Sequence, residues 1–460
     1  MAPTTPEEWL PILAARLDAA QPGISWLRSY VNGNAPLPEM GRNTRATWLA
    51  FQRKARTNMG GIACRSHSNR IVWRGVRVGS DDQSAASVAA RRIARDNRLP
   101  MQVSSAVWDM LSARVGYLVV GSREGRAIIT AEKPEQFYAE PDPLYPWVAI
   151  AALKVWRDTI ADVDYALVVV PGAWQRFARR SFTTTTAGRT DRQVRMANAG
   201  GWLPDGEPQT YDGALPVWIL DREDGQALVE PHVDVIDRIN LGKLQRLVVA
   251  AMLAFKQRAL KKDPNAPAPP DRDENGNPID YQKVYEAAPG ALWDLPEGVD
   301  IWESASTDIR PLLDGETKDA RDFAAVTGTP VSMLTPDGQN QSATGAAATT
   351  AQQVDACRAD IARIRLAVAS AMLTALRVEG IEVADTIEVD FENPAWVTLA
   401  EKMDAYSKAI AAGMSIPMAQ KEFLGWSQEQ IDEDDRHRRL MQAREQIAAL
   451  AGPVPSGNAG

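Results

Sequence analysis

The sequence predicts an α+β protein with a mixed body and two long helices. Residues 116–220 hold short β-rich runs that are separated by turn residues, whereas most of the chain before them has helical spacing. Two longer apolar patterns of helical period follow, over 230–260 and 347–378. With 460 residues, 45% of them hydrophobic, the chain is long enough for about two to four domains.

The first elements are predicted to be helices. Thr4 and Thr5 precede Pro6-Glu7-Glu8, which is typical of a capped helix start, and we expect this helix to end near Ala20. A basic helix from about Asn43 to Arg56, a strand over 72–78 and helices over 84–97 and 101–115 follow. The strands expected in the body are 117–120, 127–130, 149–157, 165–171, 174–178 and 217–220.

The second half is dominated by the two long helices. Glu230-Pro231 opens the first, which we expect to continue to about Leu260. The Pro-rich run 263–270 cannot be helical, because proline lacks the N–H group, so residues to 302 form a small inserted module. The remaining expected elements are a helix over 308–327 ended by Gly328-Thr329-Pro330, a polar loop over 335–346, the long helix 347–378, a strand over 387–391, and helices over 396–411, 417–424 and 429–450.

Composition narrows the possible functions. The formal net charge of −8 and pI near 5.2 argue against a protein that grips DNA through many phosphates, since that needs concentrated Lys and Arg. The two cysteines, Cys64 and Cys357, do not form a disulfide framework and indicate a reducing compartment. The sequence shows no signal-peptide pattern and no transmembrane run, so we expect a soluble protein.

No motif predicts catalysis. Asp271, Asp273, Asn275 and Gly276 match the start of a calcium loop, but Gln282 stands where a bidentate Glu is needed, so a turn at a hairpin tip is favoured. Cys64 and His67 supply two ligands where a structural zinc site needs four.

The chain lacks a Gly-x-Ser-x-Gly elbow and a phosphate-binding Gly-x-x-x-x-Gly-Lys loop. We therefore expect no enzyme, no metal and no cofactor. One basic stretch is better explained as an amphipathic helix with its cations in water than as a nucleic-acid site; its residues are Arg42, Arg45, Trp48, Phe51, Arg53, Lys54 and Arg56.

The order of the parts carries a stronger signal. Asp234-Val235-Ile236-Asp237-Arg238-Ile239-Asn240 opens the first long helix, and Phe255-Lys256-Gln257-Arg258 lies near its expected end. Later come Phe323–Pro330, with a Thr-Gly-Thr-Pro helix stop, and Asn340–Gly345 before the second long helix. In this combination the chain resembles the portal proteins of tailed bacteriophages, in the branch common among siphophages of Gram-positive hosts.

The resemblance implies a portal-type fold that assembles as a ring, expected to be a dodecamer, at one vertex of the capsid. It divides the chain into a wing (1–230), stem helices (231–260 and 304–327), a clip (261–303), a tunnel loop (328–346), a long helix (347–380), a wing strand with crown helices (381–450) and a disordered tail (451–460). The ring would be made in the host cytoplasm and become part of the virion.

The resemblance also implies partners and site residues. Double-stranded DNA would pass through the channel beside the tunnel-loop residues Asp337, Gln339, Asn340, Gln341 and Ser342. Terminase large subunit and the head–tail connector would dock on the clip residues Asp271, Arg272, Asp273, Glu274, Asn275 and Tyr281, and major capsid and scaffolding proteins would surround the ring. The tunnel loop has no Lys or Arg, so a prominent DNA-gripping role is not expected there.

Two other classes remain open at this point. One is a metal-dependent phage hydrolase or nuclease whose acidic residues converge only in the fold. The other is a different head–tail adaptor, although such adaptors are typically much smaller than 460 residues.

Overall fold

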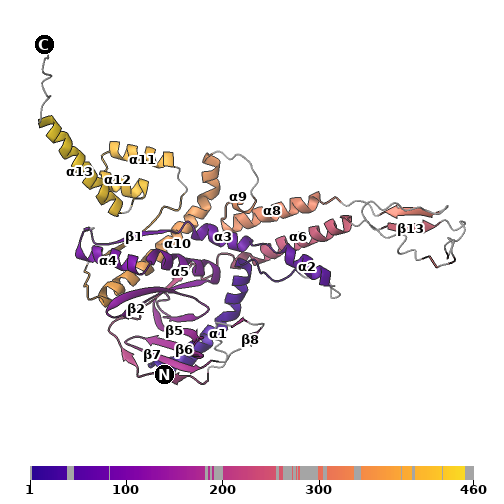
Figure 1. The fold of residues 1–460 in the computed structure, drawn as a ribbon, viewed down its shortest axis with the longest axis horizontal. Helices are drawn as coiled ribbons and strands as arrows, with labels where there is room; N and C mark the ends of the chain where they lie inside the picture. Colours follow the sequence, from indigo (N-terminus) through magenta and orange to yellow (C-terminus); the bar gives the residue numbers. More distant parts are fainter. Residues whose placement is uncertain are drawn as a thin grey trace, which may run out of the picture.

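The computed structural model describes residues 3–38, 46–81, 83–181, 185–186, 189–190, 200–254, 258–262, 272, 276, 278–279, 299–303, 308–335, 343–384, 386–395, 399–426 and 428–450. The fold is α+β, as the sequence predicts. A body of two antiparallel sheets and several helices carries a long arm on one side and a unit of three C-terminal helices on another (Figure 1).

The N-terminal helix is longer than predicted. Thr5 caps it, with its hydroxyl accepting from the Glu8 N–H while the Glu8 carboxylate accepts from the Thr5 N–H. The helix passes through Pro22 instead of ending near Ala20, because Leu27 beyond the proline is fully buried and this packing outweighs one lost backbone hydrogen bond. The helices of this region are α1 (Pro6–Val31), α2 (Ala46–Ala55), α3 (Met59–Ser68), α4 (Ala85–Asp96) and α5 (Leu99–Ala113).

The body contains two main sheets with antiparallel neighbours throughout. The first has the order β12-β2-β3, with β2 (Val115–Arg123), β3 (Arg126–Glu132) and β12 (Val217–Asp221). The second has the order β10-β7-β6-β5-β4, with β11 also on β7. Its strands are β4 (Phe137–Pro141), β5 (Ala149–Asp158), β6 (Val163–Val170), β7 (Ala173–Arg180), β10 (Leu203–Pro204) and β11 (Gln209–Thr210). The sequence did not predict β4, β10 or β11. A two-residue pair, β8 (Thr185–Thr186) and β9 (Arg189–Thr190), stands apart.

The arm consists of two helices and a pair of strands. After a short 3-10 turn (Glu230–His232), α6 (Val233–Ala254) leads to β13 (Arg258–Lys262), and β14 (Val299–Glu303) returns to α8 (Arg310–Thr327). The prediction that the first long helix reaches Leu260 is wrong. Leu260 instead faces Ile301 in the β13–β14 ladder, because strand pairing satisfies the backbone of this five-residue segment as well as a helix would.

The C-terminal part follows the predicted order. Its elements are α9 (Val331–Leu334), α10 (Ala343–Val378), β15 (Ile387–Phe391), α11 (Leu399–Ala411), α12 (Ile416–Ala419), the π-turn η2 (Gln420–Leu424) and α13 (Gln428–Leu450). Strand β15 pairs with β1 (Trp73–Val78) from the N-terminal region. At 36 residues, α10 is about 54 Å long.

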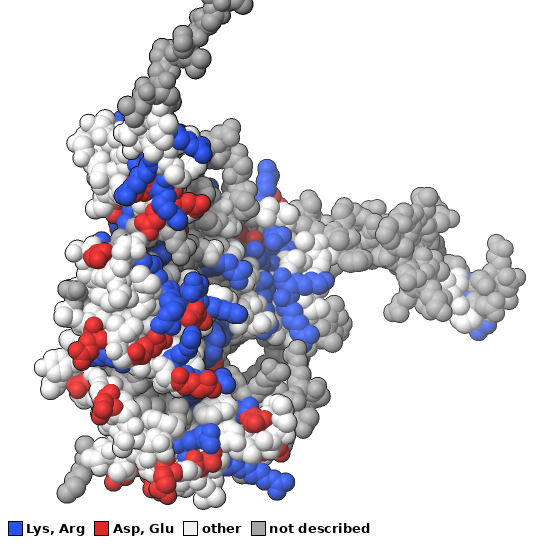
Figure 2. Space-filling view, turned by 60° about the vertical axis from the view of Figure 1, so that its left-hand side comes forward, with Lys and Arg blue, Asp and Glu red and all other residues white. Residues whose placement is uncertain are grey.

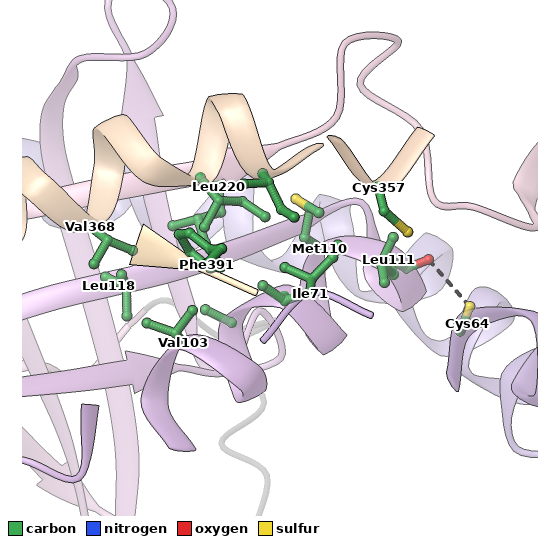
Figure 3. Packing of buried hydrophobic residues seen from close by; sticks show 14 of the residues in the cluster. Cys64, Ile71, Val103, Met110, Leu111, Leu118, Leu220, Cys357, Val368 and Phe391 are labelled. Carbon is green, nitrogen blue, oxygen red and sulfur yellow. Dashed lines mark hydrogen bonds between the residues drawn. The ribbon is translucent and has the colours of Figure 1, made fainter. Parts of the chain in front are cut away.

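The main core lies between α3, α5, α10 and the inner face of the three-stranded sheet. Leu118 and Leu220 of the sheet meet Met110 of α5 and Val368 of α10 there (Figure 3). The predicted apolar stripe of α10 is buried in this core, and it comprises Ile361, Ile364, Val368, Met372 and Leu376. Since α10 already buries one face within its own chain, its length alone does not require a neighbouring subunit.

Two smaller clusters complete the body. One packs α1 against the second sheet, and the other joins the outer face of β2 to β4 and β5. In the described part of the chain no helix has both the length and the apolar character needed to cross a membrane.

Candidate functional site

The arm is held together by ion pairs that link its two helices. Arg238 of α6 contacts Asp319 at 2.9 Å and Asp322 at 3.3 Å, both on α8. Farther along α6, Arg246 contacts Glu316 at 2.6 Å. The arginine that lies later in α6 pairs with the acidic residue that lies earlier in α8, as expected for two antiparallel helices. Both arginines in the described part of α6 are thus neutralised within the chain.

The base of the arm is fixed to the body by the motif that opens α6. Ile236 and Ile239 are buried in the main core. Between them, Asp237 accepts a hydrogen bond of 2.8 Å from the Tyr30 hydroxyl of α1. Burial, assisted by Asp237, raises the pKa of Tyr30, and burial also raises the pKa of Asp237. Both shifts favour the protonated forms of the two side chains.

A second polar anchor lies one turn farther along α6. Asn240 is fully buried, and its side-chain oxygen accepts from both the backbone N–H (3.0 Å) and the hydroxyl (2.9 Å) of Thr57. The motif quoted for the family resemblance thus supplies apolar anchors, two polar anchors and an inter-helix ion pair. Its role in this chain is to fix how the arm leaves the body.

The far end of the arm closes with the β13–β14 ladder. Arg258 faces Glu303 at its base and Lys262 faces Val299 at its outer end. The chain therefore leaves and re-enters the ladder at adjacent positions, which residues 263–298 connect. Of the proposed docking residues, Asp271, Asp273, Glu274, Asn275 and Tyr281 lie outside the described residues.

The one described docking residue belongs to a turn. Arg272 forms an antiparallel bridge with Pro278, and its guanidinium donates to the Gly276 carbonyl at 3.0 Å. Gly276 has φ +85°, a conformation that favours glycine. This geometry agrees with the turn interpretation of the Asp-x-Asp-x-Asn-Gly pattern.

The predicted helix stop after α8 is confirmed. Gly328 adopts the left-handed conformation at φ 65°, and its N–H donates to the Ala324 carbonyl. The buried Thr327 hydroxyl bonds to the Phe323 carbonyl at 2.7 Å and to the Thr329 hydroxyl at 2.9 Å. These contacts fix the direction in which the chain leaves α8.

Both flanks of the expected tunnel loop are held by the core. Leu334 of α9 is buried before the loop, and Val354 of α10 is buried after it. One residue earlier, the Gln353 amide donates to the Ser66 hydroxyl of α3 at 2.5 Å. The predicted channel residues Asp337, Gln339, Asn340, Gln341 and Ser342 lie outside the described residues, and the structure thus describes the supports of this loop.

A buried polar cluster lies where α10 crosses α3. Burial lowers the pKa of His67 to about 4 and raises that of both thiols, Cys64 and Cys357, to about 12. One turn along α10, burial raises the pKa of Asp360 to about 6, against the opposing effect of Arg222, which lies 3.8 Å away. No sequence pattern predicts that Cys64, His67 and Cys357 meet in one core, because Cys357 lies almost 300 residues from the other two.

Charge is unevenly spread over the surface. On the face shown in Figure 2, Lys and Arg form a band through the middle of the molecule, with Asp and Glu scattered beside it. Although the net charge is −8, the surface is thus not uniformly acidic. In the part of the chain that the structure describes, no three His, Cys, Asp or Glu side chains converge in a way that could hold a metal ion.

Comparisons with known proteins give structural likenesses only. No family model matches the sequence, and no curated protein does. Among solved structures, the chain is similar at 13% identity to a chain of "Virion of native gene transfer agent (GTA) particle" (TM-score 0.41, covering 88% of this chain and 93% of that chain). It is likewise similar, at 13% identity, to chains of "Neck of empty GTA particle computed with C6 symmetry" (TM-score 0.46, 88% and 94%) and "Neck of native GTA particle computed with C12 symmetry" (TM-score 0.42, 86% and 98%).

Proposed function

We propose that this chain is a portal protein, which forms a ring at one capsid vertex, conducts DNA during packaging and ejection, and docks terminase and the head–tail connector. The arm is the observation that supports this most strongly. Two antiparallel helices anchored in the core, a strand ladder at the tip, a fixed helix stop and a long returning helix follow one another in the order that the family resemblance implies. In this proposal, α6 and α8 are the stem, and the segment between β13 and β14 is the clip.

The charges of the arm suit a channel through which DNA slides. Arg238 and Arg246 are paired with carboxylates of α8, so they are less available to DNA phosphates. Tight phosphate binding would oppose movement, whereas a wall with internally paired charges leaves DNA free to pass.

Mass and shape in solution test the proposal. Light scattering on a sizing column should give a particle near twelve times the 50.3 kDa chain, and negative-stain images should show rings with a central hole. A compact monomer at every concentration would refute the proposal.

The paired arginines allow a sharper test of the channel. A ring carrying Asp319→Asn, Asp322→Asn and Glu316→Gln should retain double-stranded DNA more strongly than the wild-type ring, with a steeper dependence on salt, because all three carboxylates that pair with Arg238 and Arg246 are removed. Asp404→Asn, which breaks the exposed Asp404–Lys408 pair of α11, is the matched control. Equal DNA retention by all three rings would contradict the role given to the arm.

The docking role is tested at the ladder. Because Lys262 and Val299 face each other, a short Gly-Ser turn can replace residues 263–298 without disturbing the pairing of β13 and β14. The shortened protein should still form rings and should lose binding to terminase. Loss of the rings themselves would show that this segment is not a clip.

A further inference from the structure

An apolar hollow opens at the β12 edge of the three-stranded sheet. It measures about 410 Å³ and lies between β12, α10 and the loop that precedes β5. Trp147 and Leu366 line it although they are 69% and 71% exposed, and Trp218 forms part of its wall. Leu144, in the same loop as Trp147, is 79% exposed. Exposed apolar side chains gathered in this way mark an interaction surface.

The loop that carries Trp147 is held in place before any partner arrives. The Asp142 carboxylate accepts from the Leu144 and Tyr145 N–H groups at 2.7 and 3.1 Å. The Val148 N–H donates to the Tyr145 carbonyl, and Val148 forms a bridge to Trp218 of β12. A partner would therefore meet a preformed surface and would lose little entropy in ordering it.

The opposite edge of the same sheet, β3, has a different character. The N–H groups of Ala127, Ile129 and Ala131 all donate to side-chain oxygens of the same chain, so this edge is closed to strand addition. One of those oxygens belongs to Gln102 at the start of α5. Its neighbour Met101 is 61% exposed and offers a flexible apolar side chain beside the closed edge.

The two edges carry complementary charge. Near β3, three arginines, Arg92, Arg95 and Arg126, lie within 3.9 Å of Asp96, and Arg92 also pairs with Glu379, so this group carries an excess of one positive charge. At the other edge, four acidic residues lie around two arginines, Arg222 and Arg363, so this group carries an excess of two negative charges; the acidic residues are Asp221, Glu223, Asp224 and Asp360. Charges of opposite sign on opposite edges favour head-to-tail contact between copies over contact between like edges.

We propose that the hollow at the β12 edge receives the β3 edge of a second copy of this chain, with Met101 entering the hollow over Trp147. This inference rests on the proposed ring. A ring requires a heterologous contact that joins two different patches of the same chain. The two edges of one sheet supply such patches, and covering Trp147 and Tyr145 alone would bury on the order of 250 Å² of aromatic surface.

Cysteine cross-linking tests the contact directly. The native thiols of Cys64 and Cys357 are buried, so Met101→Cys together with Leu366→Cys places the only accessible thiols at the two sides of the contact. Mild oxidation of this double variant should give a ladder of covalent oligomers on a non-reducing gel, whereas each single variant should stay monomeric on that gel. Wild-type rings combined with no ladder would overturn the contact and leave the portal proposal standing.

Loss of the anchor gives an independent measurement. Trp147→Ala and Met101→Asp should each weaken assembly at least about 30-fold, because a buried tryptophan anchor dominates such contacts. Ile160→Asp changes an isoleucine that is 98% exposed on the β5–β6 turn, and it should assemble like the wild type. Circular dichroism checks that each variant is folded, and the cross-linking result stands if one is not.

The outcomes separate the two proposals. If the wild-type chain never assembles, the ring and this contact both fail. If rings form and Trp147→Ala assembles as well as Ile160→Asp, only the contact fails.

Discussion

Asp164 should be one of the positions of the second sheet at which substitution lowers stability most, because two buried arginines share its carboxylate. Its side chain is fully buried between two arginines that are almost as buried, Arg157 at 2.6 Å and Arg179 at 3.4 Å, and it also accepts from the Ser181 hydroxyl at 2.8 Å. Asp164→Ala leaves both guanidinium groups buried without this carboxylate, which costs roughly 3–5 kcal/mol. Hydrogen exchange of β5 to β7 should accelerate by at least about 100-fold, since about 1.4 kcal/mol corresponds to a factor of ten.

The same sheet offers a matched control. Arg176 and Asp205 pair at 2.7 Å with about a third to a half of each side chain exposed, so Asp205→Ala should cost at most about 1 kcal/mol. Equal acceleration in the two variants would refute the reasoning that burial sets the cost.

The pH dependence of the Asp164 variant provides a second check. Burial would raise the pKa of Asp164, but the hydrogen bonds from Arg157 and Ser181 and the two arginine charges outweigh it and lower the pKa. The stabilisation is therefore present above the pKa of the unfolded state, about 3.9, and is lost as the pH falls through the lower folded value. The difference between wild type and Asp164→Ala should shrink below pH of about 4, and a constant difference would contradict this assignment.

Three further predictions concern the main core. Gly116→Ala should destabilise the protein by about 3 kcal/mol or more in urea unfolding, because the added Cβ would lie 2.0 Å from a backbone oxygen of α5. Gly121→Ala on the same strand adds a Cβ with nothing within 4 Å and should cost under about 1 kcal/mol. Similar urea midpoints for the two variants would contradict this prediction. Because the folded-state pKa of Asp360 is raised to about 6, the stability of the wild type should fall as the pH rises from about 4 to about 6. Asp360→Asn should lack this pH-dependent loss of stability in a pH series of urea midpoints. The same pH slope in the variant and the wild type would contradict the role given to Asp360. Cys64 and Cys357 should react with a thiol reagent only on unfolding, at the unfolding rate, and labelling of the native protein within seconds would disprove their burial.

Local signals in the sequence suffice for most helices and strands of the body. The Thr5 cap, the Gly328 stop and the apolar stripe of α10 each encode their geometry within a few residues, and all three are confirmed. The predicted ends of α1 and α6 are wrong for one reason. In both cases distant partners decide the outcome, namely the core around Leu27 in α1 and the facing strand at Leu260.

The candidate site is predictable in outline and not in its contacts. The order of arm, stop and long helix follows from the sequence, and so does the importance of the motif that opens α6. That Asp237 meets Tyr30 and Asn240 meets Thr57 could not be predicted, because each pair joins residues about 200 positions apart. The Trp147 hollow is missed as well, since evenly spread tryptophans give no indication of which one is exposed.

The pairing of β1 with β15 determines when this protein can finish folding. Val76 faces Val389 across more than 300 intervening residues, and both side chains belong to the main core. A nascent chain that has not yet extended beyond Phe391 has neither this pairing nor a complete cover for the core. Non-local pairing of this kind slows folding and exposes unfinished edges to aggregation. Strand β15 and the N-terminal elements that it pairs with therefore belong to one cooperative body, and a chain shortened to end before β15 would leave the partner edge of β1 open.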